Sequence, residues 1–153
     1  MDMLTNEIPM IIFKKRLVLY WGNADHKMGF TTLDDTAMYT ANVALDTSSP
    51  RYLRIAGDQI SPREIREVMN ALSGQKFRLL RTGGLGLLSA IIKITQKISP
   101  GKTNLYPAWQ GMQYMRNMMD DRATLKTLDN TRYADIKWTT VKDLISNHKT
   151  KKL

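Results

Sequence analysis

Residues 30–74 decide the fold, and they read FTTLDDTAMYTANVALDTSSPRYLRIAGDQISPREIREVMNALSG. The succession of signals along this stretch predicts a turn, a helix, a strand and a second helix. The second helix has the clearest boundaries, because Ser61 suits the N-cap, Pro62 the first helical position and Glu64 the third position after the cap. Gly74 supplies the matching stop, since glycine readily adopts the left-handed conformation that ends many helices.

The first helix of this stretch is expected to begin at Asp34 or Asp35, because a carboxylate can accept hydrogen bonds from the free amide groups of a first helical turn. It should end before the Ser-Ser-Pro sequence at 48–50. The strand that follows is predicted from Tyr52 to Ile55. The apolar face predicted for the helix consists of Ala37, Met38, Ala41, Val43, Ala44 and Leu45.

The rest of the chain adds short strands and further helices. Leu17–Trp21 is a β-prone run closed by a turn at 22–25, so we predict a hairpin in which Met28–Thr32 returns as the partner strand. The alternative is that Met28–Thr32 leads into the next helix. Another strand is predicted at Phe77–Leu80. Further helices are predicted at about Leu85–Ile98, Pro107–Asp120 and Thr139–Ser146. The expected fold class is therefore α/β, with short strands and about five helices.

Length and composition fit one domain of ordinary size. The chain has 153 residues, and its 42% apolar content is enough to bury a single core, so we predict one domain over residues 1–153. The 23 Lys and Arg against 14 Asp and Glu give a net charge of +9, dispersed along the chain except in the tail at 147–153, which we expect to be a flexible basic segment. The absence of cysteine excludes disulfides and cysteine nucleophiles.

We expect a cytoplasmic protein that does not enter a membrane. The N-terminal residues lack the basic stretch, long apolar run and small-residue cleavage site of a signal peptide. The most apolar run, Leu85–Ile98, is too short for a bilayer and is interrupted by Lys93 and Lys97.

Four segments, in order along the chain, carry a resemblance to a known family. They are MDMLTNEIP, LVLYWGNADHKMGFTTLDDTAMYTANVALD, PRYLRIAGDQIS and YPAWQGMQYMRNMMDDRATLKTLDNTRYADIKWTTV. With them the chain resembles the C-terminal half of NmrA-like proteins, which are atypical members of the extended short-chain dehydrogenase/reductase superfamily. The resemblance implies the C-terminal portion of a Rossmann-like NAD(P)-binding fold whose N-terminal nucleotide-binding half is absent.

The resemblance also implies where the cofactor would bind in the parent protein. In such folds the glycine-rich phosphate-binding turn joins the first strand to the first helix, so it would precede Met1. The opening residues MDMLTNEIPMII also look like a helix or loop already under way. The chain is then an expressed fragment, a split reading frame or a separated domain. NAD(P) is implied for the full-length parent, and no cofactor is expected for this chain alone.

The helix predicted from Pro107 to Asp120 is rich in aromatic and methionine side chains, which pack adaptably against apolar shapes. The family comparison implies that this helix walls a pocket for a small-molecule substrate. The candidate substrate-binding residues are Phe30, Thr31, Trp109, Met112 and Tyr114. For any one of these side chains, a place in the apolar core is the alternative interpretation.

Two motifs have less specific patterns. Thr82–Leu88 follows a strand and opens a helix, as a pyrophosphate-binding turn does, but Ser89 stands in place of the third glycine and no acidic residue follows about twenty positions later. We interpret it as a helix start that packs closely on a neighbour. Tyr133 and Lys137 have the spacing of a reductase pair, in which the lysine charge lowers the tyrosine pKa, but this spacing is common. Catalytic residues therefore stay unassigned.

Metal and nucleic-acid binding are not expected. His26 and His148 are far apart in sequence, and neither has a second ligand at metal-binding spacing. Dispersed positive charge is typical of a solvated surface, and no nucleic-acid-binding motif accompanies it.

Two functions remain open. In the first, the chain is the substrate-side fragment of an NmrA-like NAD(P)-dependent oxidoreductase-like protein, which neither binds the cofactor tightly nor catalyses alone. In the second, it is part of a non-catalytic NAD(P)-sensing regulatory protein that binds a protein partner. Because half of the sheet is missing, an exposed strand edge should lead to self-association or to contact with a partner chain.

Overall fold

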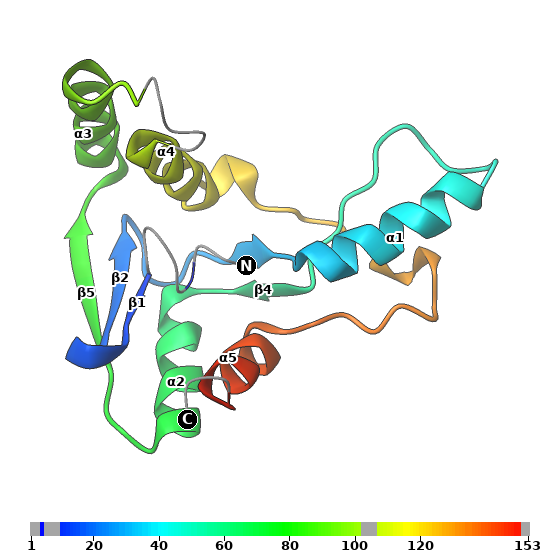
Figure 1. Cartoon of the computed structure of the whole chain (residues 1–153), viewed down its shortest axis with the longest axis horizontal. Coiled ribbons are helices and arrows are strands. Elements are labelled where there is room, and N and C mark those ends of the chain that lie inside the picture. Colours follow the sequence, from blue (N-terminus) through cyan, green and yellow to red (C-terminus); the bar gives the residue numbers. More distant parts are fainter. Residues whose placement is uncertain (1–3, 5–9, 102–106, 151–153) are drawn as a thin grey trace. The chain divides into compact units, whose positions relative to one another are not determined.

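A computed structural model describes Leu4, residues 10–101 and residues 107–150, with side chains as far as Asn147. The chain forms two compact units, each built from two separate stretches of sequence (Figure 1). Unit 1 contains residues 29–60 and the chain from Leu125 onward, and unit 2 contains the chain up to Met28 and residues 61–124. Five α-helices and several short strands make up the described residues, which confirms the expected α/β class.

Unit 2 is organised around a sheet of three strands. These are β1 (Ile11–Ile12), β2 (Leu17–Trp21) and β5 (Arg78–Gly83), in the order β1-β2-β5. β1 runs antiparallel to β2, whereas β5 runs parallel to it and lies at the edge of the sheet (Figure 1). The strand predicted at Leu17–Trp21 is confirmed, and the one predicted at Phe77–Leu80 begins one residue later and continues to Gly83.

The predicted hairpin between β2 and Met28–Thr32 is wrong. Both sides of β2 are occupied by β1 and β5, so no edge remains for a returning strand. The turn after β2 is held by other partners, because the Gly22 amide donates to the Gly83 carbonyl and the Ala24 carbonyl accepts from the Arg63 amide.

Helix α2 (Pro62–Ser73) has the boundaries that its sequence predicts. The Ser61 hydroxyl accepts from the Glu64 amide, and the Glu64 carboxylate accepts from the Ser61 amide at 2.8 Å, which completes a capping box. Gly74 ends the helix with a φ of 65°. Ile65 and Met69, one helical turn apart, are buried, and α2 packs against β2 and β5.

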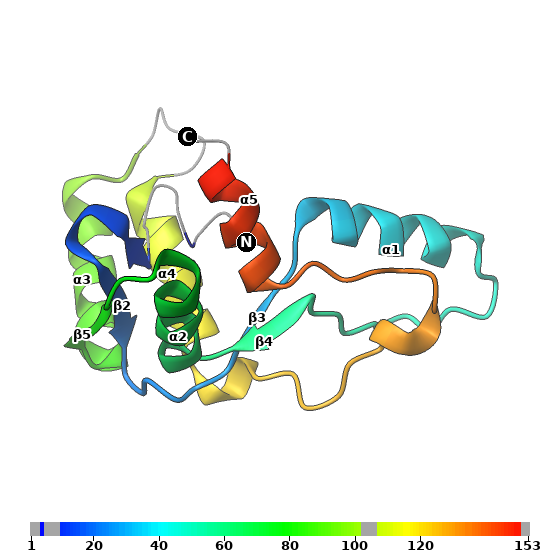
Figure 2. The ribbon, with the colours of Figure 1, turned by 90° about the horizontal axis from the view of Figure 1, so that it is seen from below.

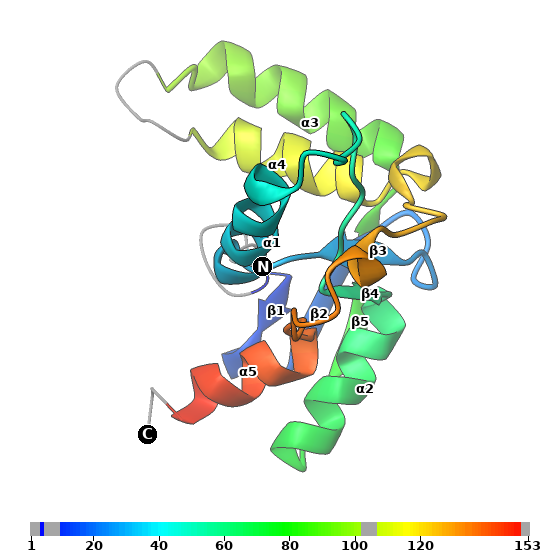
Figure 3. The same cartoon turned by 90° about the vertical axis from the view of Figure 1, so that its right-hand side faces the viewer.

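Helices α3 (Leu85–Ile98) and α4 (Ala108–Met118) pack side by side in unit 2 (Figure 3). The buried side chains recur at helical spacing, with Leu88 and Ile92 in α3 and Met115 in α4. The bounds of α3 are those predicted, and α4 lies inside its predicted range. A 3-10 turn, η3 (Asp121–Ala123), follows α4.

Unit 1 pairs β3 (Met28–Phe30) with β4 (Asp58–Ile60) and adds α1 (Leu33–Leu45). Its second stretch contributes η4 (Asn130–Arg132) and α5 (Val141–Thr150), and the extended chain between them lies alongside α1 (Figure 2).

The strand predicted at Tyr52–Ile55 is wrong, because this segment is irregular. The backbone of Arg54 exchanges hydrogen bonds with the Asp129 side chain and backbone, each at 2.7 Å, instead of joining a ladder. Asn130 binds both backbone groups of Ala56 with its side-chain amide. Tertiary hydrogen bonds therefore replace the strand pairing that the β-prone residues predict.

Helix α1 differs from its prediction in both its cap and its buried face. The N-cap is Thr32, whose hydroxyl accepts from the Asp35 amide at 3.0 Å, while Asp34 and Asp35 lie in the first turn. The side chains that are buried in α1 are those of Asp35 and Tyr39. The apolar face predicted for α1 is exposed at Ala37, Met38, Ala41, Ala44 and Leu45, and half-buried at Val43.

A buried carboxylate explains this rotation of α1. The Asp35 side chain, 1% exposed, accepts from the backbone amide and from the hydroxyl of Thr139, both at 3.0 Å. Gly57 lies against the same pair, because a Cβ there would come within 2.7 Å of the Thr139 carbonyl oxygen and 3.2 Å of the Asp35 carboxylate. The helix therefore turns its acidic residue inward, where it holds the chain before α5.

Helix α5 begins two residues later than predicted and runs to Thr150. Thr140 and Asp143 exchange hydrogen bonds in the manner of a capping box, and the Val141 amide donates to the Asp58 carboxylate at 2.9 Å. Residues 147–150 of the predicted basic tail are thus helical, and residues 151–153 lie outside the described residues. Within the described residues, every helix falls short of the length and apolarity needed to cross a bilayer.

Candidate functional site

A network of polar side chains surrounds Asp46 in unit 1, just after α1. Its carboxylate accepts from the Arg132 guanidinium at 2.7 and 2.9 Å, from the Tyr133 hydroxyl at 2.9 Å and from the Ser48 hydroxyl at 2.6 Å. The hydrogen bonds from Ser48, Arg132 and Tyr133 lower the pKa of Asp46, because they favour the charged form. Asp46 is therefore an anion held by several donors.

Tyr39 links this network to an aromatic cluster. Its ring meets Tyr133 edge-on at a centroid distance of 5.1 Å and Trp138 at 5.7 Å. Its hydroxyl donates to the Asp129 carbonyl at 2.9 Å. Burial, followed by the nearby charge of Asp129, raises the pKa of Tyr39, so this phenol stays protonated.

A concavity of about 200 Å³ opens beside Tyr39 within unit 1. It is lined by Tyr39, Thr40, Val43, Leu53 and Ile55. Pockets that enclose drug-sized ligands are commonly about 300–1,000 Å³. This hollow is therefore sized for one ring or one apolar side chain.

Sequence reasoning missed this cluster. The helical spacing of Asp35, Tyr39 and Val43 was a signal, since these three positions share one face of α1. The predicted apolar face included Val43, but its other five residues lie away from Asp35 and Tyr39 and are exposed. Leu53 and Ile55 belong to the segment predicted as a strand, and both line the hollow.

The predicted substrate-binding residues are divided between the units. Phe30 and Thr31 belong to unit 1, where Phe30 is 3% exposed and contributes to the core. Neither lines the concavity beside Tyr39. Trp109, Met112 and Tyr114 belong to unit 2, on α4.

The three α4 residues do not form one wall. Successive residues of a helix are rotated by about 100°, so Met112 projects about 60° from Trp109, whereas Tyr114 projects about 140° from it. Trp109 and Met112 are half-buried, and Tyr114 is 68% exposed. The Trp109 indole donates to the Pro100 carbonyl at 3.3 Å, which ties it to the end of α3. Trp109 and Met112 are therefore the two of these residues that share one face of α4.

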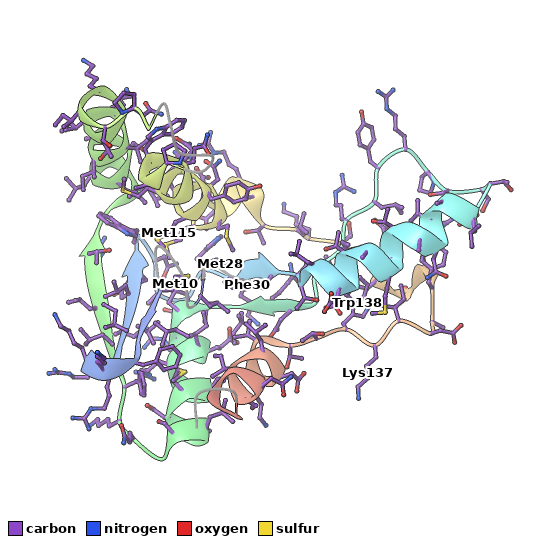
Figure 4. The ribbon with its side chains drawn as sticks, in the orientation of Figure 1. Met10, Met28, Phe30, Met115, Lys137 and Trp138 are labelled. Carbon is purple, nitrogen blue, oxygen red and sulfur yellow. The ribbon has the colours of Figure 1, made fainter. Side chains whose placement is uncertain are left out.

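The buried methionines of unit 2 belong to its core. Met10, Met28 and Met115 are each at most 4% exposed and are marked in Figure 4. These three side chains therefore belong to the apolar core and do not line a pocket wall.

The glycine-containing segment at 82–88 is closely packed at its second residue, Gly83. Gly83 ends β5, and a Cβ on it would lie 2.9 Å from both the Trp21 ring and the Leu87 side chain. The space freed by Gly83 is thus filled by protein, whereas a Cβ on Gly84 or Gly86 would meet no atom within 4 Å.

Tyr133 and Lys137 do not form a proton-transfer pair. They lie outside a helix, the Tyr133 hydroxyl donates to Asp46, and Lys137 points away from the segment that carries it (Figure 4). The neighbouring Trp138 contacts Tyr39 instead.

His26 has a structural setting in unit 2. Its Nε2 lies 2.9 Å from the Met118 carbonyl oxygen and its Nδ1 lies 2.8 Å from the Asp121 carboxylate, so it joins β2's turn to the end of α4. The side chain of His148 lies outside the described residues. No cluster of three or more potential metal ligands occurs in the part of the chain that the structure describes.

Neither the comparison with protein-family models nor that with curated proteins finds a match for this chain. The resemblance to NmrA-like proteins thus rests on the four segments alone.

Replacing Asp46 with asparagine should destabilise the protein at about pH 7, and the difference from the unchanged protein should shrink as the pH falls. The reason is that a carboxyl whose pKa is lowered in the folded state contributes stability above its ordinary value of 3.8 and loses it below. Urea unfolding midpoints at neutral and acidic pH measure this. The urea midpoint of the Arg132→Gln variant should likewise approach that of the unchanged protein as the pH falls. A difference in midpoint that persists in acid would contradict a stabilising role for the Asp46 carboxylate.

Proposed function

We propose that the chain is the substrate-side part of an NmrA-like, NAD(P)-dependent oxidoreductase-like protein. The observation that carries the proposal is that segments of the resemblance contact one another in unit 1. Asp35 binds Thr139, Asp58 binds Val141, and the Ala56 backbone binds Asn130. The residues that carry the likeness therefore act together as parts of one structure, which supports a common origin for the segments.

A small-molecule role is supported by two apolar surfaces. One is the concavity beside Tyr39 in unit 1, and the other is formed by Trp109 and Met112 on α4 in unit 2. In the parent protein, the cofactor would supply the hydride chemistry and these side chains would orient the substrate.

For the chain alone we expect no tight binding of NADH or NADPH. The expectation rests on the sequence, because Ser89 stands in place of the third glycine of the segment at 82–88 and no acidic residue follows about twenty positions later. Calorimetric titration with each nucleotide measures this directly. Micromolar affinity for either nucleotide would contradict the proposal.

The substrate side can be tested by thermal shift with a panel of aldehydes, ketones and quinones, the usual hydride acceptors of reductases. A compound that stabilises the chain should lose most of its shift in Trp109→Ala. The Tyr114→Ala variant is the matched control, because this exposed aromatic residue lies on the far side of α4. Equal losses in both variants would argue against a pocket at Trp109.

The second candidate is a non-catalytic NAD(P)-sensing regulatory protein that binds a protein partner. The specific observation in its favour is that the hydroxyl of Tyr133, the residue at reductase spacing from Lys137, donates a hydrogen bond to the Asp46 carboxylate. A compound that is bound but never reduced by a complex containing the nucleotide-binding half would favour this candidate.

A further inference from the structure

The edge strand β5 combines an open side with exposed cations that have no carboxylate partner in the part of the chain that the structure describes. Within the described residues, the sheet order β1-β2-β5 leaves one side of β5 without a partner strand. The Arg78 amide donates to the Arg16 carbonyl, which directs the backbone groups of Arg78 toward β2. Because consecutive residues of a strand point these groups to opposite sides, Leu79 and Arg81 direct theirs to the open edge.

Basic residues surround this edge. The hydrogen bond from Arg78 to Arg16 brings η2 (Phe13–Lys15) and the start of β5 together. The exposed cations of this group, which we term the β5 cluster, are Lys14, Lys15, Arg16, Lys76, Arg78 and Arg81. Leu80, between the two arginines of the strand, is 45% exposed.

The β5 cluster has no anionic counterpart among the described residues. None of its side chains lies within 4.0 Å of a described carboxylate, whereas every described carboxylate of unit 2 already contacts a cation or histidine elsewhere. Those carboxylates are Asp25, Glu64, Glu67, Asp120 and Asp121. Positive charge is common on exposed edges as protection against aggregation, but it also selects for acidic partners.

We propose that the β5 edge docks an extended acidic segment of another protein, which adds to the sheet as a further strand. The outward groups of Leu79 and Arg81 would give the main-chain hydrogen bonds, and the β5 cluster would give the preference for acidic side chains. A second copy of this chain is a poor occupant, because the two clusters would repel each other and the net charge is +9. This proposal is independent of the proposed function.

Fluorescence anisotropy with a labelled eight-residue peptide of alternating glutamate and valine tests the charge requirement on the full chain. The double variant R78Q/R81Q should raise the Kd at least tenfold. The double variant K93Q/K97Q is the control, because it removes the same charge from exposed positions of α3 and should change the Kd less than twofold. No binding of the peptide at low salt, or equal losses in the two double variants, would overturn the proposal.

The strand-addition requirement is tested separately. Arg81→Pro and Arg81→Gln remove the same charge, but only proline removes the outward backbone amide. The proline variant should therefore bind the peptide at least fivefold more weakly than the glutamine variant. If circular dichroism shows that the proline variant does not fold, a peptide with alternate backbone amides N-methylated replaces it and should lose binding to the unchanged chain. Undiminished binding of that peptide would overturn strand addition. Tighter binding of single-stranded oligothymidylate than of the peptide would instead assign the cluster to nucleic acid.

Discussion

Asp35→Ala should lower the free energy of unfolding by about 2–3 kcal/mol, since it removes a buried carboxylate and leaves the amide and hydroxyl of the half-buried Thr139 without their acceptor. Urea unfolding followed by tryptophan fluorescence measures the change, and Trp138, one residue from Thr139, reports on the same unit. The Gly57→Ala variant should also destabilise, because its Cβ would meet the Thr139 carbonyl oxygen at 2.7 Å.

The control for this prediction is Asp34→Ala. Asp34 lies in the same first turn of α1 and is exposed, so its loss removes the same charge and only the favourable interaction with the helix dipole, about 0.3–1 kcal/mol. Equal effects in the two variants would show that Asp35 acts through charge alone and not through its contacts with Thr139.

Ile92→Ala should destabilise the protein by about 3 kcal/mol, because it removes buried methyl groups and leaves a cavity between packed helices. Ile92 is 3% exposed on α3, whereas Ile94, two positions along the same helix, is 56% exposed. Ile94→Ala should therefore change the unfolding free energy by less than about 0.5 kcal/mol. Chemical denaturation of both variants measures the contrast.

A small effect at Ile92 would mean that α3 is not held by its buried face. A large effect at Ile94 would contradict the exposure of this side chain. Because the two variants carry the same substitution in the same helix, differences in helix propensity cancel between them.

Signals that lie within a few residues of one another predicted most helix boundaries. Features that depend on contacts between distant residues could not be predicted from the sequence. The capping box of Ser61 and Glu64 lies within one turn, so the start of α2 can be seen without knowing the fold. The buried face of α1 depends instead on Thr139, more than ninety positions away, and no periodicity within the helix could show that Asp35 would face inward.

The candidate site was missed for the same physical reason. Tyr133 and Lys137 suggested chemistry by spacing, but the hydroxyl of Tyr133 is committed to Asp46, a residue from the other stretch of unit 1. The β-prone residues Leu53 and Ile55 predicted a strand, yet Asp129 and Asn130 bind the backbone on either side of Ile55. Side chains with hydrogen-bonding groups, placed far apart in sequence, decided both outcomes.

The parallel pairing of β2 with β5 has a consequence for how the chain folds. Residues 29–60, which belong to the other unit, lie between the two strands in sequence, so Leu17 cannot meet Arg78 until that whole stretch has been synthesised and its loop closed. Closing such a loop loses chain entropy before any contact compensates for it. During synthesis on the ribosome, the side of β2 that pairs with β5 therefore stays unpaired until residues 29–60 and β5 have been synthesised.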